Sequence, residues 1–213
     1  MPGGRTGTTP GPDEARFPGF DVLEQRRHWD DTTAGVVLSR LSMPDPPKFH
    51  DLTQEGVARA LLDQLLDQHD APRVPVFEMI DARLAAGQTD GWHYADLPED
   101  AIAWKQALAG LDADAHDRHG HGFAEASRPA QAALVQAVQD RGQDGWRGMN
   151  ADHVWSLWTR YACTAFYSHP WAWNEIGFSG PAYPRGYKNI GIDRREPYEV
   201  RDAHPRNPLE AGS

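Results

Sequence analysis

The stretch from Tyr161 to Tyr198 constrains the fold of this chain more than any other part of the sequence. It reads YACTAFYSHPWAWNEIGFSGPAYPRGYKNIGIDRREPY, and its glycines and prolines lie among aromatic residues without a helical or strand period. Turn-forming residues at this density normally predict a solvent-exposed loop. However, each large aromatic side chain in such a segment can bury about 150–250 Å². The segment must therefore pack on something, either its own domain or a partner protein.

Composition excludes several classes of partner. The 213 residues carry a net charge of −10 and no basic run offsets it, which argues against a surface for nucleic acid or an anionic membrane. No apolar run approaches the roughly 20 residues that span a bilayer. The single cysteine, Cys163, excludes an intramolecular disulfide framework. Aliphatic residues are sparse, and eight tryptophans supply much of the apolar mass.

Apolar residues recur at helical spacing and predict an all-α fold. Five of the expected helices begin near Asp31, Asp51, Val76, Pro98 and Asn150, and the second is capped by Asp51 or Thr53. Another helix, the fifth in chain order, runs through Leu134, Val135 and Val138 and ends at Gly142. We expect an irregular bundle of five or six helices, followed by a long, non-helical arm of Gly, Pro and aromatic residues at 169–202. Residues 17–202 form a single helical domain in this interpretation, between a disordered tail at 1–16 and a flexible tail at 203–213.

Two groups of residues have the composition of a reactive site. His116, His119 and His121 have a spacing that zinc or copper accepts, but their polar surroundings favour a solvated loop. Cys163 could act as a nucleophile with His153 or His169 as its base, although a cysteine among alanines on an apolar helix face is more often a buried core residue.

Nucleotide-binding and hydrolase patterns are lacking from this sequence. It contains neither GxGxxG after a strand, nor a Walker loop, nor a GxSxG elbow. We therefore assign no catalytic, cofactor-binding or metal-binding residue to this chain.

The arm is the most informative candidate site. Tryptophan, tyrosine and arginine on a folded segment are typical of protein–protein hot spots. The candidate interface residues are Trp158, His169, Trp171, Trp173, Asn174, Glu175, Phe178, Tyr183, Arg185 and Tyr187. The alternative is that the arm caps its own helical bundle, and the two roles are compatible if each uses a different face.

Several segments resemble one known family. FYSHPWAWNEIGFSGPAYPRGYKNIG, preceded by VWSLWTRYACTA, is similar to the C-terminal signature of the gluconate 2-dehydrogenase subunit 3 family. FPGFDVLEQRRHWDDTTAGVVLSRL, PRVPVFEMIDARLAAG and GWHYADLPEDAIAWKQAL resemble its larger members. The resemblance covers about residues 17–200.

The resemblance implies a small helical subunit of an FAD-dependent sugar or sugar-acid dehydrogenase. Its large partner would be a flavoprotein of the glucose-methanol-choline (GMC) oxidoreductase type, sometimes accompanied by a cytochrome c subunit. FAD and the catalytic base would lie in that partner. The small subunit would support the partner's folding, stability and, in many members, its twin-arginine export as a passenger.

This sequence departs from the family in its N-terminal region. Arg26 and Arg27 form a twin-arginine pair, but polar and acidic residues follow where an export signal needs an apolar stretch. The sequence alone thus indicates a cytoplasmic protein, whereas many family members are periplasmic.

Two rival functions remain open. One is a self-contained metal- or Cys/His-dependent enzyme that uses His153, Cys163, His169 and Glu175. The other is a freestanding chaperone that releases its client after folding.

Overall fold

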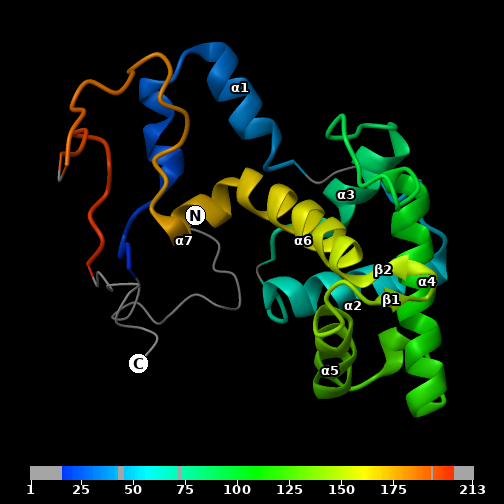
Figure 1. Cartoon of the computed structure of the whole chain (residues 1–213). Helices are drawn as coiled ribbons and strands as arrows, with labels where there is room; N and C mark the ends of the chain where they lie inside the picture. Colours follow the sequence, from blue (N-terminus) through cyan, green and yellow to red (C-terminus); the bar gives the residue numbers. More distant parts are fainter. Residues whose placement is uncertain (1–15, 43–45, 72, 193, 204–213) are drawn as a thin grey trace. The chain divides into compact units, whose positions relative to one another are not determined.

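The computed structural model describes residues 16–42, 46–71, 73–192 and 194–203, and it is mostly helical (Figure 1). Its helices, in chain order, are the 3₁₀ helix η1 (Val22–His28), α1 (Asp31–Ser39), α2 (Leu52–Leu66), α3 (Val76–Ala85), α4 (Asp100–His119), the 3₁₀ helix η2 (Phe123–Glu125), α5 (Arg128–Gln139), α6 (Ala151–Ser168) and α7 (Pro170–Ile176). Strands β1 (Gly145–Trp146) and β2 (Met149–Asn150) form a small antiparallel hairpin. The all-α prediction is confirmed. None of the described helices is long and apolar enough to cross a membrane.

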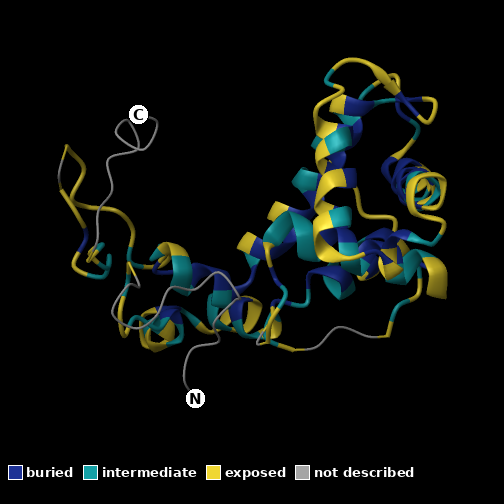
Figure 2. Cartoon of the chain, turned by 90° about the horizontal axis from the view of Figure 1, so that it is seen from below, coloured by how far each residue is buried: buried dark blue, intermediate teal, exposed yellow. Residues whose placement is uncertain are grey.

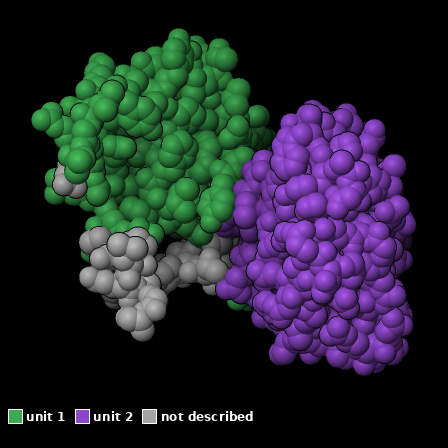
Figure 3. Space-filling view, viewed as in Figure 1, with its two compact units in different colours: residues 1–43, 70–74, 167–213 green, residues 44–69, 75–166 purple. Residues whose placement is uncertain are grey.

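The chain divides into two compact units, which Figure 3 colours separately. Unit 1 comprises residues 1–43, 70–74 and 167–213, and unit 2 comprises residues 44–69 and 75–166. The sequence pattern did not predict this division. The predicted tails at 1–16 and 203–213 lie outside the described residues, except for Arg16 and Ala203.

Local sequence signals explain where most helices begin and end. Asp51 and Gln54 form the capping box that starts α2, in which Asp51 Oδ1 accepts from the Gln54 amide at 2.8 Å. α1 is capped by Asp30, whose carboxylate accepts from the Thr33 amide at 2.8 Å. α4 runs further than predicted because helix-compatible residues continue as far as Gly120, which adopts the left-handed conformation (φ 77°) that ends helices.

The core of unit 2 is formed by α2, α4, α5 and α6. α2 packs against both α4 and α5. The largest side chains of this core that are almost fully inaccessible to solvent are Leu61, Trp104, Leu108, Leu111, Phe123, Leu134, Leu157, Trp158 and Tyr161. The buried Gln131 amide joins three elements, because its oxygen accepts from Gln64 of α2 and its nitrogen donates to the Phe123 carbonyl of η2, each at 3.0 Å.

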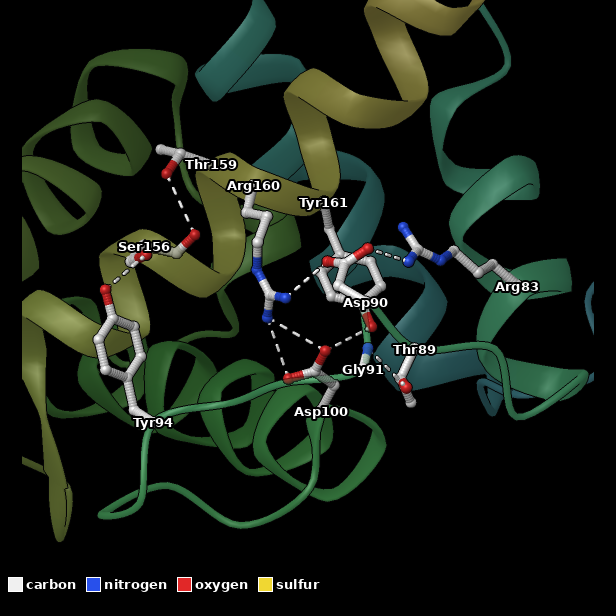
Figure 4. A network of polar contacts seen from close by, with 10 residues as sticks. All are labelled: Arg83, Thr89, Asp90, Gly91, Tyr94, Asp100, Ser156, Thr159, Arg160 and Tyr161. Carbon is white, nitrogen blue, oxygen red and sulfur yellow. Dashed lines mark hydrogen bonds and ion pairs between the residues drawn. The ribbon is translucent and has the colours of Figure 1, made fainter.

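A polar network ties the segment between α3 and α4 to α6 (Figure 4). The buried Asp100 carboxylate accepts from Arg160 at 3.0 and 3.1 Å and from the Tyr161 hydroxyl at 2.8 Å. Asp90 pairs with Arg160 at 2.6 Å and also with Arg83. Burial, followed by the hydrogen bond to Asp100, raises the pKa of Tyr161. Both carboxylates of this network are therefore paired with cations, as the burial of a carboxylate requires, although the buried Arg160 Nε has no hydrogen-bond partner.

Unit 1 is built around a small apolar cluster. Val22, Trp29, Val37 and Trp173 form its buried centre. α7 packs against η1, and the Asn174 side chain of α7 accepts a hydrogen bond from the Val22 amide at 2.8 Å.

The arm is not wholly non-helical, contrary to the prediction for 169–202. It begins with α7, because three signals for a helix coincide within nine residues. His169 is the N-cap and accepts from the Trp171 amide at 3.2 Å, Pro170 occupies the first helical position, and Gly177 ends the helix in the left-handed conformation. Seven residues are too few for a hydrophobic period to reveal such a helix.

Gly180 is required by both its backbone and its surroundings, so the Gly180→Ala substitution should destabilise unit 1. Its φ is +77°, and an added Cβ would overlap the Trp29 ring. We expect a loss of about 2–4 kcal/mol in the free energy of unfolding, from left-handed strain plus overpacking. Urea unfolding followed by tryptophan fluorescence measures it.

Gly186→Ala is the matched control, because Gly186 has a similar φ of +70° but open space around the added Cβ. This variant should lose only the strain, about 1–2 kcal/mol. Equal losses in the two variants would show that packing of Gly180 against Trp29 contributes nothing.

Candidate partner-binding surface

The chain that follows α7, residues 177–203, is called the terminal segment below. It is held in shape by a carboxylate near its end. The Glu196 side chain accepts hydrogen bonds from the backbone amides of Lys188 and Asn189 and is itself buried. The Glu196 amide in turn donates to the Glu199 carboxylate at 2.6 Å. These contacts close the loop between Lys188 and Glu196 and satisfy polar groups that the loop removes from water.

An arginine organises the first half of the terminal segment. The Arg185 guanidinium lies 3.8 Å from the centroid of the Tyr198 ring and donates to the carbonyls of Ser179 and Pro181, each at 3.2 Å. It also donates to Gln25 of η1 at 2.9 Å. These contacts explain why a segment without regular secondary structure keeps a defined path.

The terminal segment nevertheless leaves large apolar side chains in solvent, and Figure 2 shows most of it as exposed. Tyr183 is 65% exposed and Tyr187 is 54% exposed. Ile190 and Ile192 are 84% and 94% exposed. Several large apolar residues exposed on one short ordered segment are typical of an interaction site.

The structure sorts the predicted interface residues by accessibility. Phe178, Tyr183 and Tyr187 are exposed. Trp171, Asn174, Glu175 and Arg185 are half-buried. Their role at an interface remains a prediction.

Three of the predicted interface residues are inside the protein, which corrects their placement at a surface. Trp158 is fully buried in unit 2, where its ring meets Trp146 edge to face at 5.6 Å. Trp173 is buried in the unit 1 cluster, and its indole N–H donates to the Tyr167 carbonyl at 2.6 Å. His169 is buried as the N-cap of α7.

The sequence interpretation missed Ile190 and Ile192. The signal was present, since both β-branched residues flank Gly191 in a stretch that has no helical or strand period to bury them.

The residues of the rival enzyme do not assemble into a reactive pair within unit 2. His153 Nδ1 lies 2.7 Å from Asp96 Oδ1, and its ring stacks on Tyr94 at 3.7 Å. Cys163 is ten residues further along α6, about 15 Å along a helix axis. The thiol is exposed, contrary to the predicted core position, because Ala162 and Ala165 occupy the buried face of α6. Partial desolvation raises the pKa of this thiol, which disfavours the nucleophilic thiolate.

His169, which belongs to the same rival, and the separate histidine group at 116–121 have structural surroundings. His169 is engaged by the Trp171 amide and by the Arg40 backbone. His116 and His119 lie at the end of α4 rather than in a loop, and His121 follows Gly120. Within the part of the chain that the structure describes, no group of three His, Cys, Asp or Glu residues is placed to hold a metal ion.

His169 should make unit 1 less stable in acid. Burial lowers the pKa of His169 from its ordinary 6.5 to about 4, so the unfolded chain takes up the proton before the folded chain does. This stability is complete above pH 6.5 and is lost as the pH falls towards 4, by roughly 3 kcal/mol in total. Unfolding free energies measured in urea between pH 7 and pH 5 report the slope.

The His169→Asn variant is the control, since asparagine is a good N-cap but does not titrate. Its pH dependence should be flatter than that of the wild-type chain. An unchanged slope would contradict the neutral, buried state of His169.

The comparisons with known proteins identify a family for this chain. A family model described as gluconate 2-dehydrogenase subunit 3 matches residues 53–180, which run from the second residue of α2 to the end of unit 2 and continue through α7. No curated protein and no solved structure matches the chain. The matched region covers more than half of the sequence and ends at Gly180, so the exposed residues after it belong to the part beyond the match. The chain therefore belongs to the gluconate 2-dehydrogenase subunit 3 family, whose name denotes a subunit of a multi-subunit dehydrogenase.

Proposed function

We propose that this chain is a non-catalytic accessory subunit that binds the flavoprotein subunit of a sugar or sugar-acid dehydrogenase through its terminal segment. The observation that supports the proposal most directly is an ordered segment with Tyr183, Tyr187, Ile190 and Ile192 in solvent. Such a surface is costly to leave in water and gains free energy when a partner covers it. Membership in a family of dehydrogenase subunits makes the catalytic subunit the natural partner.

The partner that we propose is a GMC-type flavoprotein, with a cytochrome c subunit in some complexes. We place FAD in that partner, because this sequence contains no dinucleotide-binding fingerprint and the resemblance assigns the flavin to the large subunit. The accessory subunit would support folding, stability and, where a signal is supplied, export of the flavoprotein.

The geometry of the terminal segment suits such a role. Its carboxylate and arginine contacts fix the backbone before binding, so little conformational entropy remains to be lost when a partner docks. Exposed tyrosines bring large contact area with few rotatable bonds, which favours them at binding surfaces.

Co-purification tests the assignment. The tagged chain, purified from its own cells, should elute from a size-exclusion column together with a large chain that shows a flavin absorbance spectrum and oxidises a sugar. A transient chaperone would instead elute without its client. Sugar oxidation by the purified chain alone, free of flavin and of any partner, would contradict the proposal.

The Tyr183→Ala/Tyr187→Ala double variant should weaken the complex with the flavoprotein by on the order of 2–4 kcal/mol, the range of interface hot spots. Its own unfolding free energy should change little, because both rings are largely in solvent. Trp92→Ala is the matched control, as Trp92 is 50% exposed in unit 2. Calorimetric titration measures the affinities.

Trp173→Ala separates docking from core packing. Trp173 is 3% exposed, so its removal should lower the stability of the isolated chain by about 3–5 kcal/mol. If the two tyrosine substitutions were instead to lower stability and leave affinity unchanged, the terminal segment would be part of the protein core and not a docking surface.

A further inference from the structure

We infer that the terminal segment recognises an acidic surface with an apolar centre on the flavoprotein subunit; the inference rests on the proposed function. Among its described residues, the segment combines exposed apolar side chains with exposed charged side chains of a single sign. The structure thus indicates both which segment of this chain binds the partner and what chemistry the partner's surface should have.

The charges of the terminal segment are unevenly exposed. By sequence it holds five cations and four carboxylates. Among its described residues, the charged side chains classed as exposed are all basic: Lys188, Arg194, Arg195 and Arg201. The segment therefore presents a positive surface although its formal charges nearly balance.

Three of the four carboxylates bind groups within the protein, and the fourth, Asp193, lies outside the described residues. Glu196 is 6% exposed and binds backbone amides of its own loop. Asp202 forms an ion pair with Arg16 at 2.5 Å and is 12% exposed in its side chain, and Glu199 accepts from the Glu196 amide. Folding of the segment thus removes negative charge from its surface and leaves the cations outside.

Basic residues flank the most exposed apolar residues of the terminal segment. Lys188 precedes Ile190 by two residues, and Arg194 follows Ile192 by two; Asp193, between Ile192 and Arg194, lies outside the described residues. A surface of this kind fits an apolar depression with a rim of Asp and Glu, because apolar groups are covered at the centre while charges pair at the edge.

The negative charge on the rest of the chain should orient the protein when it meets an acidic partner. The terminal segment carries a formal net charge of +1 by sequence, so the net negative charge of the chain lies entirely outside it. An acidic partner would therefore repel the body of the protein and attract the segment, which orients the encounter. The same negative body disfavours an anionic membrane as the occupant, since a lipid surface would meet the repulsion over a wide area.

Charge reversal tests the inference. The wild-type chain and the Lys188→Glu/Arg194→Glu variant are each combined with the flavin-containing chain that co-purifies with the wild type, and association rates are measured at low and high salt. We expect the variant to associate at least about tenfold more slowly at low salt. The wild-type rate should fall as salt is added, and the difference between the two should shrink.

Arg118→Glu/Arg128→Glu is the matched control, with the same change in net charge at two exposed cations of unit 2. This control should keep the wild-type association rate to within a few-fold. Thermal unfolding of all three chains shows whether each remains folded.

The outcomes separate the two proposals. If the flavoprotein binds the wild type but neither salt nor charge reversal in the terminal segment changes the rate, the inference is overturned and the proposed function stands. Equal slowing of the Lys188→Glu/Arg194→Glu variant and the control overturns the inference as well, because the net charge of the chain would then explain the association rate without any special role for the terminal segment. If the wild-type chain binds phosphatidylglycerol vesicles, and the Lys188→Glu/Arg194→Glu variant loses this binding but still binds the flavoprotein normally, the basic surface serves a lipid and the inference is overturned. If no flavoprotein associates with the wild-type chain, the proposed function fails and the inference fails with it.

Discussion

Burial of the Trp173 indole is the interaction on which unit 1 depends. The ring lies in one cluster with Val22 of η1, with Trp29 just after η1, and with Val37 of α1. Its N–H donates to the Tyr167 carbonyl. These contacts bring residues from the beginning and the end of the chain into one small core. The terminal segment follows α7 directly, so the position where it begins depends on the packing of the Trp173 ring.

The aromatic residues of the C-terminal region fall into a buried and an exposed set. Trp173 packs inward, while Tyr183 and Tyr187 stay in solvent. The difference arises from polar contacts: Glu196 and Arg185 use the backbone of the segment as their hydrogen-bonding partner and hold it in an open loop. Because these contacts engage backbone groups of the segment, its exposed apolar and basic side chains are what remains for a partner, and this is the physical basis of the proposed subunit role.

The sequence was sufficient for the parts of the fold that follow from local rules. Apolar periodicity and the Asp51 cap located α2, and the His169-Pro170 pair correctly marked the end of α6. α7 was missed because helices of seven residues carry no usable period, although Pro170 and Gly177 signalled its ends. The division into two units depends on contacts between segments far apart in sequence, such as η1 with α7, and no local signal reports those.

The sequence did not show which of the candidate interface residues are accessible to solvent. Trp158 and Trp173 are as suited to a hot spot as to a core, and only the three-dimensional packing decides between them. Cys163 illustrates the opposite error, since one residue along a helix is a turn of about 100° and carries the thiol from the buried to the exposed face. The sign of the exposed charge was also hidden, because the sequence lists Glu196 beside Arg195 without showing which of them is buried.

Hydroxyl-radical footprinting of Tyr183, Tyr187, Ile190 and Ile192 tests the central claim most directly. The account predicts that these side chains are oxidised readily in the isolated chain and become protected when the flavoprotein is bound, while the exposed Trp92 of unit 2 serves as a reference. Protection of the four residues already in the isolated chain, or equal oxidation in the free and bound states, would contradict it.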